Sequence, residues 1–387
     1  MASQDICVDA WSLHLLNFID DENNNKEGKR NYLGWQSTCN TVGQASGVFT
    51  GMSLLLMLES HNFCNKYIRP IFSFKDQAYG LIKFSNFLLF WGIIFIIVTC
   101  SIALFCREPE GSNDDRGKEG VEHFTIKETY LSVVKLYRRS SMWHLTFILL
   151  TFSMGFAATA SMTHLKLIEH GITKETIGLT AIPLILIQIT VPFSVTRSTT
   201  SRKPLNLFIY SYIPRLIMSL VVLILIYLTP LFHIAETVKF HWYYYLVLVL
   251  ILSLNEALTS AMFVSRQAFF AQIADPRIGG TYLTLLNTLA NFSFLSFNSI
   301  NLFIAGRISK IKSLTAKLDT YTLMVICCTV LGVLWFVLTY RAMIRLQKIS
   351  IEKWHLEKNK KFSDADIDNK EERDGELVSL SVSPITA

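Results

Sequence analysis

Long apolar runs separated by short polar segments dominate the chain. Each run is close to the roughly 20 residues that a helix needs to cross the hydrocarbon core of a bilayer. Backbone polar groups cannot stay unpaired in lipid, and unbroken runs of this length are too long for barrel strands, so the pattern predicts transmembrane helices. The eight predicted spans are Leu33–Glu59, Phe84–Cys106, Trp143–Leu165, Thr176–Val195, Tyr210–Phe232, Trp242–Val264, Thr281–Ala305 and Thr320–Tyr340.

A polar segment separates the first two predicted spans from the other six. Residues 108–120 are rich in charged residues, Gly and Ser, which predicts a flexible stretch. Residues 124–140 have amphipathic helical spacing and a basic end, which predicts a helix along the membrane surface. The chain is therefore divided into a partial N-terminal bundle (1–106), a linker (107–142), a C-terminal six-helix bundle (143–344) and a disordered tail (345–387).

Composition supports an all-α, polytopic membrane protein. Hydrophobic residues make up 51% of the chain and charged residues 17%, below the roughly 25% charged residues of soluble domains. The net charge of +6 is modest and its basic residues lie in loops and tail, so no nucleic-acid partner is expected.

The distribution of basic residues orients the predicted helices. One set of loops holds 19 Lys and Arg and the opposite set holds 11. The first set should face the cytosol, including the linker and the tail. The first set comprises 18–32, 107–142, 196–204, 265–280 and 341–353, and the second 60–83, 166–175, 233–241 and 306–319.

Asp5 and Asp9 are four residues apart, so a helix would place both carboxylates on one face. Two carboxylates at this spacing repel each other and favour sharing one proton, which suits a proton-coupled site. The alternative is that both acids cap the start of a short helix or lie on the protein surface.

Two charged residues lie inside predicted spans. Arg215 follows Pro214, about one turn into the span Tyr210–Phe232, where it could bind an anion in a polar cavity or extend to the interface. Glu256 is near the middle of the span Trp242–Val264, too deep to reach the interface easily. It is therefore a candidate to carry a proton or to pair with Arg215.

Asparagines recur along one predicted span. Asn287, Asn291, Asn298 and Asn301 could line a polar pathway or join neighbouring helices by hydrogen bonds. The sequence contains no GxxxxGK[ST], HExxH, GxSxG or CxxC motif, and its cysteines show no metal-ligand spacing. We therefore predict no enzymatic activity, no catalytic residues, no metal site and no cofactor.

Five sequence blocks resemble the acetyl-coenzyme A transporters of the major facilitator superfamily. This resemblance runs from residue 3 to about residue 345. It implies a bundle of two six-helix halves, in a multi-pass protein of the endoplasmic reticulum membrane. It also implies import of acetyl-CoA from the cytosol into the lumen, linked to protons, with acetyl-CoA, protons and the lipid bilayer as partners. The blocks are QDICVDAWSLHLL (4–16), STCNTVGQASGVFTG (37–51), ESHNFCNKYIR (59–69), FSNFLLFWG (84–92) and DPRIGGTYLTLLNTLAN (275–291).

The chain departs from the family pattern in three ways. It begins within what would be the fourth helix, so the resemblance implies that 1–106 holds half of helix 4 with helices 5 and 6. Ala10 stands where a glycine is usual, and Phe292–Phe297 replaces a Gly-rich stretch. The sequence is interpreted as N-terminally truncated, through an incomplete gene model or as a paralogue without transport activity.

A substrate and proton pathway is predicted from these residues. It comprises Asp5, Asp9, Asn40, Gln44, Arg215, Glu256, Asn287 and Asn291. Three alternatives to an acetyl-CoA transporter stay open. One is a permease for another bulky anion, because bacterial muropeptide permeases are similar around residues 5–11. The others are a membrane acyltransferase, which would need a buried catalytic histidine although no histidine lies in the middle of a predicted span, and a scaffold without transport.

Overall fold

The computed structural model describes residues 8, 11–12, 33–105, 126–199, 203–232, 240–275, 278–310, 319–350 and 353–354. Within these ranges the long elements are all helices and no β-strand occurs. The predicted all-α membrane helix bundle is therefore confirmed.

The helices fall into an N-terminal and a C-terminal group. The first group consists of α2 (Leu33–Val48), the π-helix η1 (Phe49–Leu54), α3 (Leu55–Glu59), α4 (His61–Phe63), the π-helix η2 (Cys64–Ile68) and α5 (Phe84–Phe105). The second consists of α6 (Ile126–Tyr137), α7 (Ser140–Thr151), the 3₁₀-helix η4 (Phe152–Gly155), α8 (Ala157–Glu169), α9 (Lys174–Thr199), α10 (Leu205–Leu228), the 3₁₀-helix η5 (Thr229–Phe232), α11 (Trp242–Ile273), α12 (Gly279–Ile308) and α14 (Thr320–Lys348).

Seven helices in the described ranges are long and apolar enough to cross a membrane. They match seven of the eight predicted spans. The eighth, Leu33–Glu59, is helical throughout but is not among the seven. The π-helix η1 explains the difference, because it divides the span into α2, of 16 residues, and α3, of 5 residues, each shorter than the roughly 20 residues that cross a bilayer.

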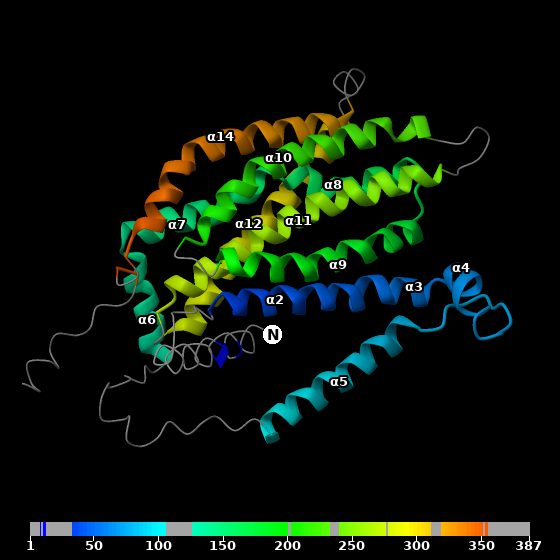
Figure 1. Ribbon diagram of the computed structural model, residues 1–387, viewed down its shortest axis with the longest axis horizontal. Coiled ribbons are helices and arrows are strands. Elements are labelled where there is room, and N and C mark those ends of the chain that lie inside the picture. Colours follow the sequence, from blue (N-terminus) through cyan, green and yellow to red (C-terminus); the bar gives the residue numbers. More distant parts are fainter. Residues whose placement is uncertain are drawn as a thin grey trace, which may run out of the picture.

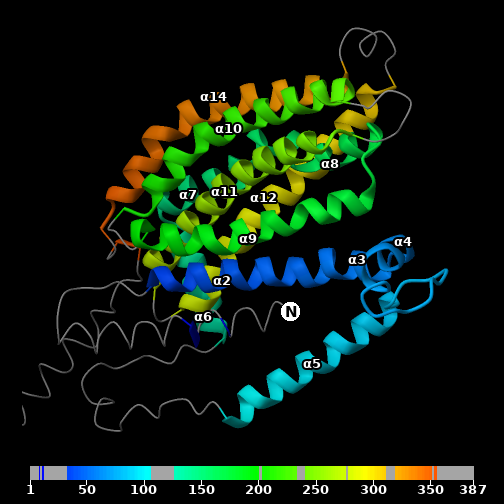
Figure 2. The same ribbon diagram turned by 45° about the vertical axis from the view of Figure 1, so that its right-hand side comes forward.

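The helices of the C-terminal group pack side by side, and α2 joins them (Figure 1). Helix α11 lies against α9 and α10, while α14 lies against α10 and α8. Helix α2 packs along α9 and α11. In both views α5 diverges from α2 and the bundle (Figure 2). Only 6% of its membrane-length window is buried, so α5 contributes little to the core.

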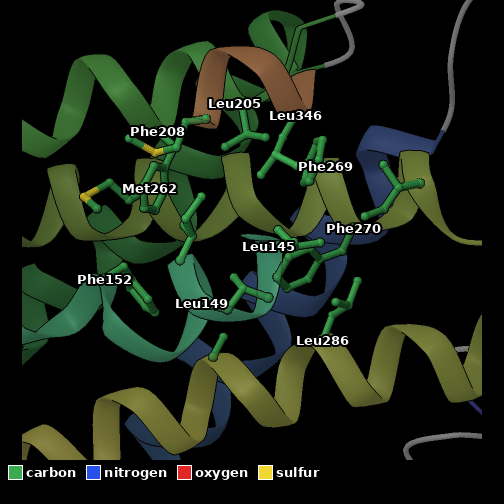
Figure 3. Close-up of a cluster of buried hydrophobic side chains, with 14 of the residues drawn as sticks. Leu145, Leu149, Phe152, Leu205, Phe208, Met262, Phe269, Phe270, Leu286 and Leu346 are labelled. Carbon is green, nitrogen blue, oxygen red and sulfur yellow. The ribbon is translucent and has the colours of Figure 1, made fainter. Parts of the chain in front are cut away.

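A cluster of apolar side chains fills the space between α7, α10, α11, α12 and α14 (Figure 3). Tyr212 of α10 is fully buried in it, with its ring stacked 4.8 Å from the Trp335 ring. Its hydroxyl donates a hydrogen bond of 3.2 Å to the carbonyl of Phe152. That carbonyl lies at the change from α7 to η4, so Tyr212 supplies a partner where the α-helical pattern is interrupted.

The interrupted helix is held at a fixed place by its neighbours. The Trp335 indole N–H donates 2.7 Å to the Thr151 hydroxyl, and the hydroxyls of Ser153 and Ser293 are 2.7 Å apart. Gly155 lies directly against Gly332 of α14: a Cβ on Gly155 would be 2.8 Å from the Gly332 Cα. Two glycines therefore allow the backbones of η4 and α14 to approach closely.

We expect Gly155→Ala to lower the melting temperature of the purified protein. The added methyl group meets the backbone of α14, which cannot rotate away, and overpacking of this kind costs about 1–3 kcal/mol. Gly306→Ala on α12 is the matched control, because a Cβ there meets nothing within 4 Å. A Gly155→Ala protein that melts at the wild-type temperature would contradict the close approach of η4 and α14.

The folded part of the chain extends beyond the predicted six-helix bundle at both ends. Helix α6 coincides with the amphipathic helix predicted within the linker, and its Leu136 is buried in the same apolar cluster. Residues 345–350 and 353–354, assigned to the tail, belong to the folded part: α14 continues to Lys348, and Trp354 packs edge-on to Phe269. Burial of the Trp354 ring explains why the fold extends beyond the last apolar run.

Candidate functional site

The predicted pathway residues of the N-terminal part are only partly described. Asp5 and Asp9 lie outside the described residues, so their pairing stays a prediction. Asn40 is half-buried and Gln44 is exposed on α2. Both residues are on α2, which packs along α9 and α11.

Arg215 lies much deeper than the sequence indicated. Helix α10 begins at Leu205, so Arg215 is ten residues from its start, about 15 Å along the axis. Its side chain is 9% exposed. The prediction of a position one turn into the helix is wrong, because Leu205, Phe208 and Ile209 are buried and extend the helix.

The Arg215 guanidinium has weak partners only. Its central carbon lies 4.1 Å from the centre of the Phe156 ring, and one N–H points to the Met262 sulfur at 3.8 Å. The ring attracts the cation, but it does not accept the in-plane N–H groups. A lone arginine at the centre of a membrane helix costs about 2.5–3.5 kcal/mol on insertion scales, so this placement calls for a reason.

Glu256 is a half-buried acid that interacts electrostatically with Arg215. It is 14 residues after Trp242 and 17 before Ile273, which agrees with the predicted mid-helix position. Its carboxylate accepts a hydrogen bond of 2.7 Å from the Gln188 side chain of α9. It also attracts Arg215 across the α10–α11 contact, although the two form no direct ion pair among the described residues.

Gln188 was not among the predicted residues. It stands in an apolar run, ILIQITV, and a single amide in such a run is the signal that could have found it. By joining α9 to α11 through Glu256, it fixes the position of the carboxylate. The structure thus brings Arg215, Glu256 and Gln188 together from three helices.

A second buried arginine contradicts the expectation that Arg215 is the only cation within a span. Arg266 was assigned to the loop 265–280, but α11 continues to Ile273 and Arg266 is 8% exposed. The apolar residues after it, notably Phe269, Phe270 and Ile273, are the signal that extends the helix. Moving Arg266 out of the loop count leaves the sign of the basic bias unchanged.

Asn287 is held by a neighbour that the sequence did not single out. Gln267, 7% exposed and next to Arg266, donates a hydrogen bond of 2.7 Å to the Asn287 side chain. Asn291 is exposed on α12. Asn301 donates 2.9 Å to the Ser161 hydroxyl of α8, so it joins two helices. Among the asparagines of α12, Asn287 therefore bonds to Gln267, the neighbour of Arg266, and Asn301 joins α12 to α8.

The buried polar groups of α9, α10 and α11 suit two kinds of chemistry. Guanidiniums with free in-plane donors bind carboxylates and phosphates. A buried carboxylate next to a cation can exchange a proton as the cation gains or loses another partner. In the described part of the chain no group of three His, Cys, Asp or Glu side chains is placed to hold a metal ion.

Comparison with known proteins places this site in context. The sequence profile of the family described as "Acetyl-coenzyme A transporter 1" matches residues 1–207 and 199–317. An uncharacterized protein of Schizosaccharomyces pombe is 29% identical over 75% of this chain and 50% of its own length. An uncharacterized membrane protein of Saccharomyces cerevisiae is 24% identical over 91% of this chain and 73% of its own length.

The chain thus spans about half the length of the fission yeast relative. No solved structure matches it. The family profile, in contrast, covers most of the chain, including α2, α9, α10, α11 and α12, which carry the buried polar groups. The chain therefore belongs to the acetyl-coenzyme A transporter 1 family, a family of membrane transporters rather than enzymes.

Proposed function

We propose that the chain transports acetyl-CoA from the cytosol into the lumen of the endoplasmic reticulum, by alternating access of a major-facilitator-type bundle and together with protons. The observation that carries this proposal is Arg215, buried deep in α10 beside Glu256 in a member of this family. Acetyl-CoA carries several negative charges on its phosphates, and a path across the membrane must offer fixed positive charge to replace their hydration.

Each predicted residue receives a role in this proposal. Arg215 binds a phosphate group of the substrate, and Glu256 carries the coupled proton. When Glu256 is ionised it holds Arg215 by electrostatic attraction, and when protonated it releases Arg215 for the anion. Asn287 and Asn291 line the path on α12, with Asn40 and Gln44 on α2. Asp5 and Asp9 form a second proton site.

The proposal is tested by uptake into sealed vesicles that contain the purified chain. Acetyl-CoA labelled in the acetyl group should accumulate, and a lower pH on the side from which it enters should increase the rate. A labelled muropeptide serves as the comparison substrate, since a permease for another bulky anion is the alternative. Uptake of the muropeptide without uptake of acetyl-CoA would refute the proposed substrate.

The orientation of the protein is a separate prediction. The basic bias places the linker 107–142 and the residues after Arg341 in the cytosol. A protease-sensitive tag inserted at Ser112 should therefore be cut in sealed microsomes without detergent. A tag inserted at Ser313, in a loop of the opposite set, should be cut only after detergent is added. The reverse pattern of protection would show that the orientation is wrong.

A further inference from the structure

The second buried arginine, Arg266, has no role in the transport scheme above. Its guanidinium lies among three aromatic rings, 5.2 Å from the centre of Phe152, 5.1 Å from Phe263 and 5.9 Å from Phe270. Phe263 and Phe270 are on α11 itself, and Phe152, labelled with Phe270 in Figure 3, is on η4. These rings attract the positive charge but accept none of its in-plane N–H groups.

No described residue accepts a hydrogen bond from Arg266. A guanidinium offers five N–H donors. The structure gives Arg266 no hydrogen bond and no ion pair among the described residues, and its buried Nε has no partner. Buried polar groups in native proteins are almost always paired, so an unpaired cation of this kind indicates a partner that binds from outside.

Arg215 and Arg266 form a pair. Met262, which receives an N–H of Arg215, is one turn before Arg266 on α11. The two guanidiniums are close enough to repel each other. Each lies over a ring of the same interrupted helix, Arg215 over Phe156 and Arg266 over Phe152. The break at η4 thus sets two aromatic rings, four residues apart, beneath two arginines.

The described part of the chain does not balance the charges of this pair. Glu256 attracts Arg215, but no carboxylate in the described part of the chain pairs with Arg266. Among the described residues, two cations and one acid therefore leave an excess positive charge at this place. When Glu256 is protonated, as proposed for the anion-bound state, the excess is two charges. An anion with two negative centres would then balance the pair and use donors from both forks, which a single negative centre would do less completely.

We propose that Arg266 and Arg215 together bind a diphosphate group, with Arg266 as a substrate-binding residue. The proposal rests on the proposed function only for the source of that group, which would be the diphosphate of acetyl-CoA. A second source of negative charge is the headgroup of phosphatidic acid, whose single phosphate group carries close to two negative charges. Both sources predict a site that requires the Arg266 guanidinium, and they differ in what displaces the bound group.

Thermal unfolding of the purified chain in detergent tests the site without transport. Sodium pyrophosphate should raise the melting temperature in a saturable way, at concentrations about tenfold or more below those needed for inorganic phosphate. Sodium chloride at matched ionic strength should produce no such rise, and neither should pantetheine, which lacks phosphate. In Arg266→Gln the affinity for pyrophosphate should fall about 10- to 100-fold. Without ligand, this variant should melt at a higher temperature than the wild type, because an unbalanced buried charge has been removed.

The matched control is Arg307→Gln on α12, an exposed arginine that also lies over a phenylalanine ring, 5.1 Å from the centre of Phe303. It should respond to pyrophosphate like the wild type. Equal responses of Arg266→Gln and the wild type would overturn the proposal. If Arg266→Gln does not fold, the wild-type protein decides: no saturable pyrophosphate effect, or equal affinities for pyrophosphate and phosphate, would also overturn it.

Nanodiscs distinguish the sources of the phosphate group. With phosphatidylcholine alone, acetyl-CoA should stabilise the wild type and compete with pyrophosphate if the substrate supplies the group. If phosphatidic acid in the nanodisc removes the pyrophosphate response, and does so only when Arg266 is present, the group comes from a lipid. Pyrophosphate binding without any effect of acetyl-CoA would support the anion site and contradict the proposed transport function. Acetyl-CoA uptake without pyrophosphate binding would support the proposed transport function and contradict the anion site.

Discussion

Arg215→Ala is expected to reduce acetyl-CoA uptake into vesicles to the level of vesicles without protein. The variant removes the guanidinium that the proposal assigns to a substrate phosphate, deep in α10 and 9% exposed. Loss of one partner of a buried charge pair costs about 2–5 kcal/mol, which weakens binding at least about 30-fold. Arg215→Lys keeps the charge but loses the planar fork of donors, so it should retain part of the activity.

Two comparisons make the Arg215 result interpretable. Arg341→Ala removes an exposed arginine from α14 and should leave uptake unchanged. Monodisperse purification and an unchanged helical circular-dichroism spectrum would show that Arg215→Ala is folded. Normal uptake by a folded Arg215→Ala protein would mean that the arginine has no part in binding the substrate.

Glu256→Gln is expected to remove most of the effect of a pH gradient on uptake. Glutamine resembles the protonated acid, so it cannot alternate between attracting Arg215 and releasing it. The glutamine at position 256 can still form a hydrogen bond with Gln188, as the Glu256 carboxylate does at 2.7 Å in the wild type. Uptake should therefore continue at a rate that varies little with pH, rather than stop.

The measurement is the ratio of initial uptake rates with and without an inward proton gradient. The wild type should show a ratio well above one and Glu256→Gln a ratio near one. Glu169→Gln is the control, because Glu169 is an exposed acid whose contact with Lys166 lies at the end of α8. A variant that keeps the full gradient dependence would assign the coupled proton elsewhere, with Asp5 and Asp9 as the next residues to test.

The sequence was sufficient for the membrane-spanning helices because their signal is local. Runs such as Phe84–Cys106 carry enough apolar residues to identify a span without knowledge of their neighbours. The mid-helix position of Glu256 followed from the same runs. The positions of the helix ends could not be predicted in the same way. Buried helix ends can contain polar residues, and these interrupt the apolar run by which a span is identified. Arg266 was placed in a loop for that reason, although Phe269 and Phe270 after it are buried.

Contacts between helices were beyond the sequence. Nothing in the order of residues indicates that Gln188 bonds to Glu256, or that Gln267 bonds to Asn287. The interruption at η4 depends on Tyr212 and on Gly332, which lie 60 and 177 residues further along the chain than Phe152 and Gly155, respectively. Such long-range pairs set where the two arginines lie, so the paired guanidiniums emerge only from the folded structure.

Exchange of acetyl-CoA across a sealed membrane tests the central claim most directly. Vesicles containing the purified chain are loaded with unlabelled acetyl-CoA and diluted into a trace of acetyl-CoA labelled in both the acetyl and the adenine parts. The account predicts that the two labels enter together, faster than in vesicles loaded with buffer alone, and that mass spectrometry recovers the intact molecule inside. Entry of the labels at the rate of protein-free vesicles, or of the acetyl label alone, would contradict it.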